Sequence, residues 1–177
     1  MSDGTKAKLR IWHPLRDAYH CAFRMARILA ELDSKPVEFE RIRILDMFVL
    51  FPPLLHRTKM PMDMRDHFKG LRVIKPEELF ESVPSNAAIF RDLRAFQRVA
   101  VSYLAAREIL ERASLKRGEI AYIGKNVPSD LAESIEVRNN EQKGLIEFLV
   151  REYGSLPLGG SDGLFKRSAL PGEHVLT

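Results

Sequence analysis

The stretch from Glu40 to Leu55 reads E-R-I-R-I-L-D-M-F-V-L-F-P-P-L-L, and it decides the fold. Between Ile44 and Phe51 only Asp46 is polar, so a helix formed here is apolar on nearly every side. Such a helix is buried centrally, with other elements packed against it. The alternative is a β-strand, because Phe48 to Phe51 are all residues that favour strands. The length of the apolar run favours the helix, and Pro52-Pro53 ends it because proline lacks an N–H.

The side chains of this helix divide into a core and one exception. Those that we expect to be largely buried are Ile44, Leu45, Phe48 and Leu50. Asp46 is a carboxylate inside the most apolar window of the chain. Because buried charges need a partner, we expect Asp46 to be an exposed or capping-type partner of a neighbouring arginine.

Size and charge set the next limits. The chain has 177 residues, enough for one hydrophobic core, and its formal net charge is +4. Residues 1–118 contain 22 Lys and Arg against 15 Asp and Glu, whereas residues 119–177 contain 6 against 9. This distribution indicates an anionic partner for the first part, either nucleic acid or an acidic protein. The alternative is that the basic residues only solvate helix faces.

Cysteine usage and hydropathy indicate the compartment. Cys21 is alone, so no intrachain disulfide is possible and a reducing compartment is expected. The N-terminus shows no signal peptide pattern, and no window approaches the roughly 20 apolar residues of a membrane span. We therefore expect a soluble cytoplasmic protein with no membrane contact.

The first helix is predicted from Leu15 to Leu32, where apolar residues recur at three- and four-residue spacing. Residues 1–10 are polar and expected to be disordered, and Trp12 is expected to pack against the core. The outward face is predicted to hold Arg16, His20, Arg24, Arg27 and Glu31. A metal site at His13 and His20 is not expected, since no second pair at ligand spacing accompanies them.

The longest helix is predicted to follow a cap at Ser85-Asn86. Its apolar face is formed by Ile89, Phe90, Leu93, Phe96, Ala100, Tyr103 and Leu104. Arg91, Arg94 and Arg98 fall on the opposite face, because residues three and four apart are neighbours on a helix. Lys116 and Arg117 extend the basic character, and these five residues are the candidate contacts for DNA or a partner.

A short strand from Ile120 to Ile123 and turn residues at Gly124-Lys125-Asn126 predict a β-hairpin. A winged-helix domain has the same order of elements, helices followed by a small hairpin. This comparison is an analogy at the level of the fold. The predicted fold is mainly α with a small β-hairpin, a winged-helix-like single domain with a C-terminal helical extension. Residues 54–66 are predicted to be irregular, and Pro76 to start a short helix through Glu81.

The C-terminal third is predicted to add two helices. One runs from Ser129 to Val137, and the next is capped by Asn139 or Asn140 with Leu145, Ile146, Phe148, Leu149 and Tyr153 facing inward. Residues 157–163 are irregular, and residues 164–170 can dock. The domain is therefore assigned to residues 11–154, followed by an extended tail at 155–177.

Catalytic and cofactor motifs are missing from the sequence. Neither G-x-x-x-x-G-K-[ST] nor G-x-G-x-x-G occurs, so no nucleotide fingerprint is present and no cofactor is expected. Cys21 follows His20 directly, and adjacent side chains on a helix point apart, which disfavours a nucleophile–base pair. A non-catalytic role is favoured over an enzyme with an unfamiliar site.

Three segments carry a family resemblance. Trp12–Arg24, Arg41–Leu55 and G-L-F-K-R-S-A-L at Gly163–Leu170 resemble a middle component of bacterial ABC-three-component systems, the Lamassu-type anti-phage operons. The resemblance implies a small, helical, winged-helix-like accessory subunit. Its implied partners are an SMC-like ATPase that senses DNA and an effector, often a nuclease. The resemblance carries no catalytic residue over to this chain.

Two function classes follow. The first is a non-catalytic subunit that bridges the ATPase, the effector and DNA, the DNA being contacted without sequence preference. The second is a free-standing winged-helix DNA-binding regulator, for which Gln97 and Ser102 are the residues able to read base edges. The basic residues could instead pair with acids on the ATPase or on this chain, such as Asp92 or Glu108.

Overall fold

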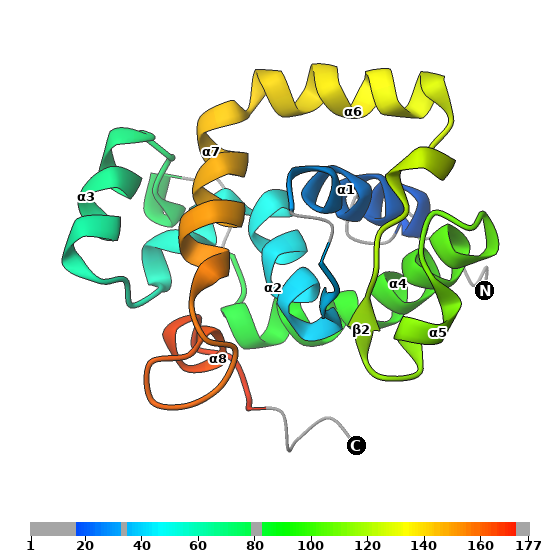
Figure 1. The fold of residues 1–177 in the computed structure, drawn as a ribbon. Helices are drawn as coiled ribbons and strands as arrows, with labels where there is room; N and C mark the ends of the chain where they lie inside the picture. Colours follow the sequence, from blue (N-terminus) through cyan, green and yellow to red (C-terminus); the bar gives the residue numbers. More distant parts are fainter. Residues whose placement is uncertain (1–16, 33–34, 79–82, 173–177) are drawn as a thin grey trace, which may run out of the picture.

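The computed structural model describes residues 17–32, 35–78 and 83–172, and this part of the chain is mainly helical (Figure 1). The α-helices are α1 (Ala18–Glu31), α2 (Phe39–Leu50), α3 (Met62–Gly70), α4 (Asn86–Ala106), α5 (Arg112–Leu115), α6 (Ser129–Glu141), α7 (Lys143–Glu147) and α8 (Leu164–Arg167). Two strands, β1 (Val37–Glu38) and β2 (Glu119–Ile120), form a small antiparallel sheet. The predicted fold class is confirmed at this level.

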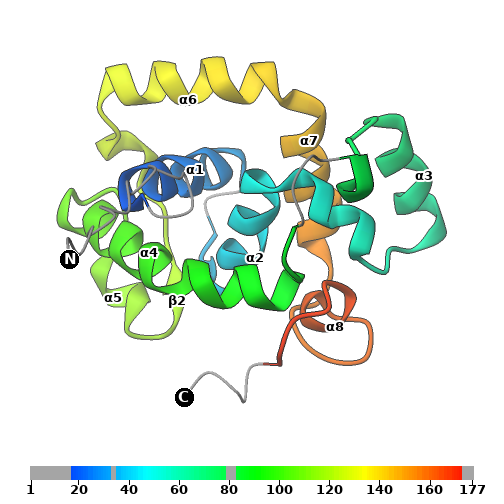
Figure 2. The same cartoon turned by 180° about the vertical axis from the view of Figure 1, so that it is seen from behind.

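Helix α2 is the central element, as predicted. Its side chains from Ile42 to Val49 are all buried, which confirms the prediction for Ile44, Leu45 and Phe48. Leu50, predicted to be largely buried, is half-buried at the end of the helix. Helices α1, α2 and α4 pack against one another, and α7 with the following π-helix η5 (Phe148–Glu152) covers another side of α2 (Figures 1 and 2). The chain stops α2 at Leu50 and continues through Pro52 as the 3-10 helix η2 (Pro52–Arg57).

Side chains cap the two long helices that flank α2. The Asp17 carboxylate accepts hydrogen bonds from the backbone N–H groups of Tyr19 (2.8 Å) and His20 (3.1 Å). The Ser85 hydroxyl accepts one from Ala88 N–H at 3.2 Å, which confirms the predicted start of α4. Each cap satisfies backbone donors that have no partner within the first turn of a helix.

The two strands come from distant parts of the chain. Val37 pairs with Ile120 and Glu38 with Glu119, so the sheet is not the local hairpin predicted at residues 120–126. Residues 121–123 instead pair with residues 109–111 in an isolated antiparallel bridge. Glu111 N–H donates to the Ala121 carbonyl (2.9 Å), and Ile123 N–H donates to the Ile109 carbonyl (2.8 Å). Residues 124–126 form the 3-10 turn η4 that leads to α6.

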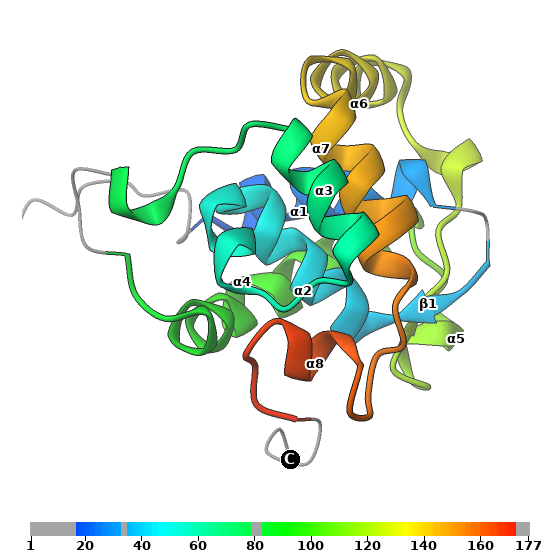
Figure 3. The ribbon, with the colours of Figure 1, turned by 90° about the vertical axis from the view of Figure 1, so that its left-hand side faces the viewer.

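Helix α3 occupies part of the region predicted to be irregular. It begins after Pro61, carries Asp63 in its first turn, and buries Phe68. A 3-10 turn, η3 (Pro76–Glu78), follows, and the rest of the helix predicted to reach Glu81 lies outside the described residues. Figure 3 shows α3 next to α7, and Figure 1 shows that α3 lies at one end of the molecule, beyond α7.

The C-terminal elements close the bundle. Helix α6 continues past Asn139 to Glu141 and crosses above α1, so neither Asn139 nor Asn140 is a helix cap (Figure 1). After η5 and the 3-10 turn η6 (Tyr153–Ser155), a loop leads to α8. The side chains of Leu164, Phe165 and Leu170 are buried against the core, so this part of the predicted extended tail is packed, as the docking prediction for residues 164–170 anticipated.

Candidate functional site

The five basic residues predicted as contacts come from α4 and from the turn after α5, and they are called the α4–α5 basic surface below. Arg91 and Arg98 are exposed and Arg94 is half-buried, because the opposite face of α4 faces the core. Lys116 and Arg117 are exposed. The predicted outward face of α4 is therefore what the structure shows, and the role of the five residues as contacts stays a prediction.

A groove joins the two halves of this surface. It has a volume of about 260 Å³, and its lining includes Arg98 and Ser102 from α4 and residues 115, 118 and 119 from the α5–β2 turn. Gly118 reverses the chain there with φ of 73°, a conformation that favours glycine, and its carbonyl accepts from Phe39 N–H at 2.9 Å. The reversal brings Gly118 and Glu119 to the same groove as Arg98.

Two acidic residues lie next to the basic ones. Arg91 Nε is 3.5 Å from Asp92 Oδ1, and Arg117 Nε is 3.1 Å from Glu119 Oε2. Asp92 was one of the acids that the sequence suggested as a partner. Both pairs are exposed, and exposed pairs contribute about 0–1 kcal/mol. These ion pairs therefore leave the surface able to exchange them for an anionic ligand.

A buried polar network lies beneath this surface and joins α1, α2 and α4. Asp46 is completely buried, and its carboxylate accepts hydrogen bonds from Arg24 Nε (2.7 Å), Gln97 Nε2 (2.8 Å) and the Cys21 thiol (3.6 Å). The expectation that Asp46 pairs with an arginine is correct, and the expectation of an exposed or capping position is wrong. Arg24, predicted to face solvent, is buried because it neutralises this carboxylate.

Arg43 extends the network toward the basic surface. Its guanidinium is fully buried, donates to Gln97 Oε1 (2.8 Å) and Glu40 Oε2 (2.6 Å), and lies 4.1 Å from the ring centroid of Phe90. Burial lowers the Arg43 pKa, Glu40 opposes that shift, and the nearby cations Arg94 and Arg98 lower it further. Gln97 therefore faces inward and cannot read base edges, whereas Ser102 is exposed.

A second buried cluster fixes α6 onto α1. Arg27 donates through Nε to Asn139 Oδ1 (2.9 Å) and through Nη2 to Gln142 Oε1 (2.7 Å), and Asn139 Nδ2 donates to the Arg27 carbonyl (3.0 Å). Burial, aided by Arg138, lowers the Arg27 pKa to about 10. Arg27 was predicted to be exposed. It is buried because it meets a helix more than one hundred residues away in sequence.

Cys21 lies in the core, where its surroundings suppress the reactivity of a thiol. Burial and the neighbouring Asp46 carboxylate raise the pKa of the Cys21 thiol, which keeps it protonated and unreactive. Among the described residues, no three His, Cys, Asp or Glu side chains gather closely enough to hold a metal ion. His13, Trp12 and Arg16 lie outside the described residues, so the expectations for them stay predictions.

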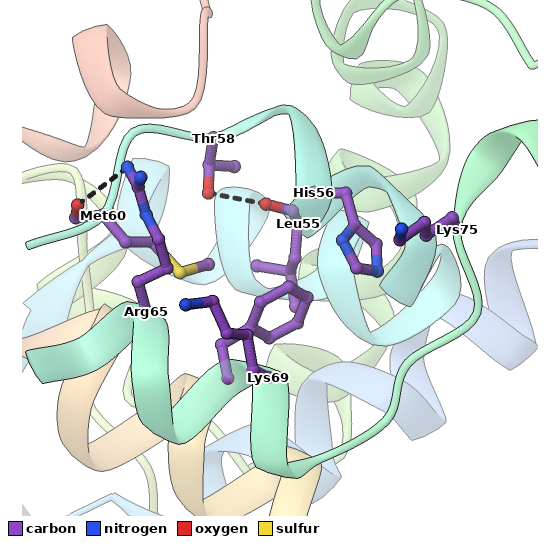
Figure 4. A pocket seen from close by; sticks show the side chains of 8 residues that line it. Leu55, His56, Thr58, Met60, Arg65, Lys69 and Lys75 are labelled. Carbon is purple, nitrogen blue, oxygen red and sulfur yellow. Dashed lines mark hydrogen bonds between the residues drawn. The ribbon is translucent and has the colours of Figure 1, made fainter. Parts of the chain in front are cut away.

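A pocket of about 500 Å³ opens between η2 and α3, a region in which the sequence predicted no site (Figure 4). Its lining residues are Leu55, His56, Thr58, Met60, Arg65, Phe68, Lys69 and Lys75. The floor is apolar and the rim is basic. Composition could have drawn attention to it, because residues 52–75 contain six Lys and Arg against two Asp.

A comparison of the sequence with models of protein families gives a match. The matching family model is described as "ABC-three component (ABC-3C) system Middle Component 5", and the match covers residues 10–174. The chain belongs to this family. No curated protein and no solved structure matches it.

The segments that carried the resemblance build the core of this middle component. Residues 41–55 form most of α2 and the start of η2, and residues 163–170 contain α8, which packs on the bundle. A middle component belongs to a system of several components, so this chain has partner subunits. In the described residues, no helix of the middle component is long and apolar enough to cross a membrane.

Proposed function

We propose that this middle component is a non-catalytic accessory subunit of an anti-phage system, bridging an SMC-like ATPase and an effector such as a nuclease. The α4–α5 basic surface meets the DNA backbone in the assembled complex, which works in the cytoplasm. The observation that carries the proposal is this surface, which presents five cations, three of them on α4, the helix that the buried polar network ties to α2.

Phosphate binding suits the chemistry of the surface. Arg91, Arg94 and Arg98 follow one side of α4, and about 1.5 Å of rise per residue spreads them over roughly 10 Å. Arginine binds phosphate through several N–H groups, and lysine through a compact charge. Contacts of this kind carry no sequence information, so the expected DNA binding is weak and independent of sequence.

A free-standing regulator is less well supported. Such a protein reads base edges with amide or hydroxyl side chains. Gln97, the amide proposed for that role, donates to the Asp46 carboxylate and the Arg43 carbonyl inside the core. Specific binding of an operator by the purified chain alone would favour the regulator.

The test is co-expression of the chain with the proteins encoded by the two flanking genes. We expect the chain to copurify with a coiled-coil ATPase and an effector. Neighbours that encode no coiled-coil ATPase would contradict the proposal. The variant Arg91→Glu/Arg94→Glu/Arg98→Glu should keep both subunits and lose copurifying DNA. The charge-matched control is Lys35→Glu/Lys125→Glu/Lys166→Glu, which replaces exposed lysines on other elements.

A further inference from the structure

The pocket between η2 and α3 combines an apolar floor with a cationic rim. Leu55, Met60 and Phe68 are buried at its floor. Arg65 and Lys69 project from α3, while His56 and Lys75 come from the segments facing it (Figure 4). The charged side chains among the described lining residues are all basic, so the pocket complements an anionic ligand.

Existing contacts position three of the four rim side chains. Arg65 Nη2 donates to the Met60 carbonyl at 3.3 Å, and His56 Nε2 is 2.8 Å from the Val73 carbonyl. Lys69 Nζ is 2.9 Å from Asp66 Oδ1 in an exposed ion pair, a contact of small energy. The arginine contact is to a neutral carbonyl, so its positive charge is available to a ligand.

The surroundings favour a protein segment over a small free anion. The rim residues His56, Arg65, Lys69 and Lys75 are all exposed, so the pocket is open rather than enclosed. Met62 lies one turn before Arg65 on the same face of α3, and its side chain is 82% exposed. An apolar centre, a polar rim and an exposed methionine are features of protein interfaces.

The pocket is also rigidly attached to the core. Phe68 packs against Phe148 of η5 with ring centroids 5.7 Å apart, and His67 Nδ1 is hydrogen-bonded to Glu152 Oε1. Figure 1 shows α3 and α5 at opposite ends of the molecule. The pocket and the α4–α5 basic surface can therefore be occupied at the same time.

We propose that this pocket binds an acidic amphipathic segment of a partner subunit. An apolar anchor side chain of that segment rests on Phe68 and Leu55, and flanking carboxylates meet Lys69, Arg65 and Lys75. The inference rests on the proposed function for the existence of a bridging role, and it assigns one of the two surfaces that a bridge requires.

Site-specific photocrosslinking in the co-expressed complex is the first test. Benzoylphenylalanine replaces Met62, and replaces Val137 of α6 in the control, a residue that is 54% exposed. We expect Met62 to crosslink to a partner subunit within a segment that carries Asp or Glu beside a large apolar residue. An assembled complex without that crosslink would overturn this inference alone, whereas failure of any complex to form would overturn the proposed function.

The crosslinked segment, made as a fluorescent peptide, is the probe in the second test. We expect the variant Arg65→Glu/Lys69→Glu/Lys75→Glu to lower peptide affinity about tenfold, since it replaces three attractive charges by three repulsive ones at an exposed rim where each pair contributes little alone. The charge-matched lysine control and the Arg91/Arg94/Arg98 variant should bind as the natural chain does. Equal affinity in the pocket variant, or displacement of the peptide by micromolar ATP, would contradict the proposal.

Discussion

Arg24 Nε lies 2.7 Å from Asp46 Oδ1 in the middle of the bundle, where the Asp46 side chain is entirely shielded from solvent. The pair joins α1 to α2, and Gln97 of α4 donates to the same carboxylate. The three helices that form the core are thus fixed in register by one buried anion.

Removal of this anion should be costly. We expect Asp46→Ala to lower the free energy of unfolding by about 3–5 kcal/mol, because it leaves the Arg24 guanidinium buried without its counter-charge. Replacing both partners by leucine should cost less than that single change. Urea denaturation measures both, and a loss below about 1 kcal/mol for Asp46→Ala would show that the pair is not a buried structural element.

The central helix should be equally sensitive to loss of volume. Phe48 is completely buried and packs edge-on against Tyr153 with centroids 5.5 Å apart. We expect Phe48→Ala to lower the free energy of unfolding by about 3–5 kcal/mol, the range for an aromatic side chain removed from a core. Leu50→Ala is the matched comparison and should cost less, since Leu50 is only half-buried. An equal cost at both positions would mean that α2 is not packed as described.

Stability should fall at alkaline pH because of Cys21. Its thiol has an ordinary pKa of 9.0, which applies to the unfolded chain, and burial raises that pKa in the folded protein. The folded state therefore keeps a proton that the unfolded state loses, so the stabilisation present below pH 9 declines as the pH rises.

Comparison with Cys21→Ala isolates the effect of the thiol. Between pH 9 and 10 the natural chain should lose about 1 kcal/mol more stability than the variant. Tyr153, whose pKa burial also raises, is common to both proteins. Parallel curves of unfolding free energy against pH would show that the thiol is not protected from ionisation.

Two glycines give a paired test of the packing between α2 and η6. A Cβ atom on Gly154 would lie 2.6 Å from the Leu149 carbonyl oxygen, so Gly154→Ala should destabilise the protein by about 1–3 kcal/mol. Gly70 has no heavy atom within 4 Å of such a Cβ, so Gly70→Ala should be neutral or stabilise by up to about 1 kcal/mol. Thermal denaturation of both variants provides the comparison, and similar melting temperatures would contradict it.

Local patterns in the sequence predicted the central helix, the Ser85 cap and the outward face of α4. They failed where the partner is distant in sequence. Arg24 and Arg27 have the spacing of a solvent-facing row, and only the positions of Asp46 and Asn139 in the fold show why both are buried. Ile120 has strand character, yet its strand pairs with Val37 rather than with an adjacent segment.

The sequence analysis did not predict the pocket between η2 and α3, for a related reason. Pro53, Pro61, three methionines and scattered charges made residues 54–66 resemble a loop. Pro61 instead precedes α3, and Phe68 anchors the helix on η5. The sequence shows that residues 52–75 are rich in Lys and Arg. Three of these basic side chains line one pocket only because the contact between Phe68 and Phe148 positions α3.

The salt dependence of DNA binding tests the central claim most directly. The purified complex is titrated against a duplex of arbitrary sequence at several salt concentrations, with the natural chain, the Arg91→Glu/Arg94→Glu/Arg98→Glu variant and the charge-matched lysine control. Each phosphate contact contributes roughly −0.9 to the slope of log K against log salt. The account predicts weaker binding and a slope reduced in magnitude by roughly 2–3 for the arginine variant only. Unchanged affinity and slope, with loss of complex assembly, would contradict it and identify the surface as a protein interface.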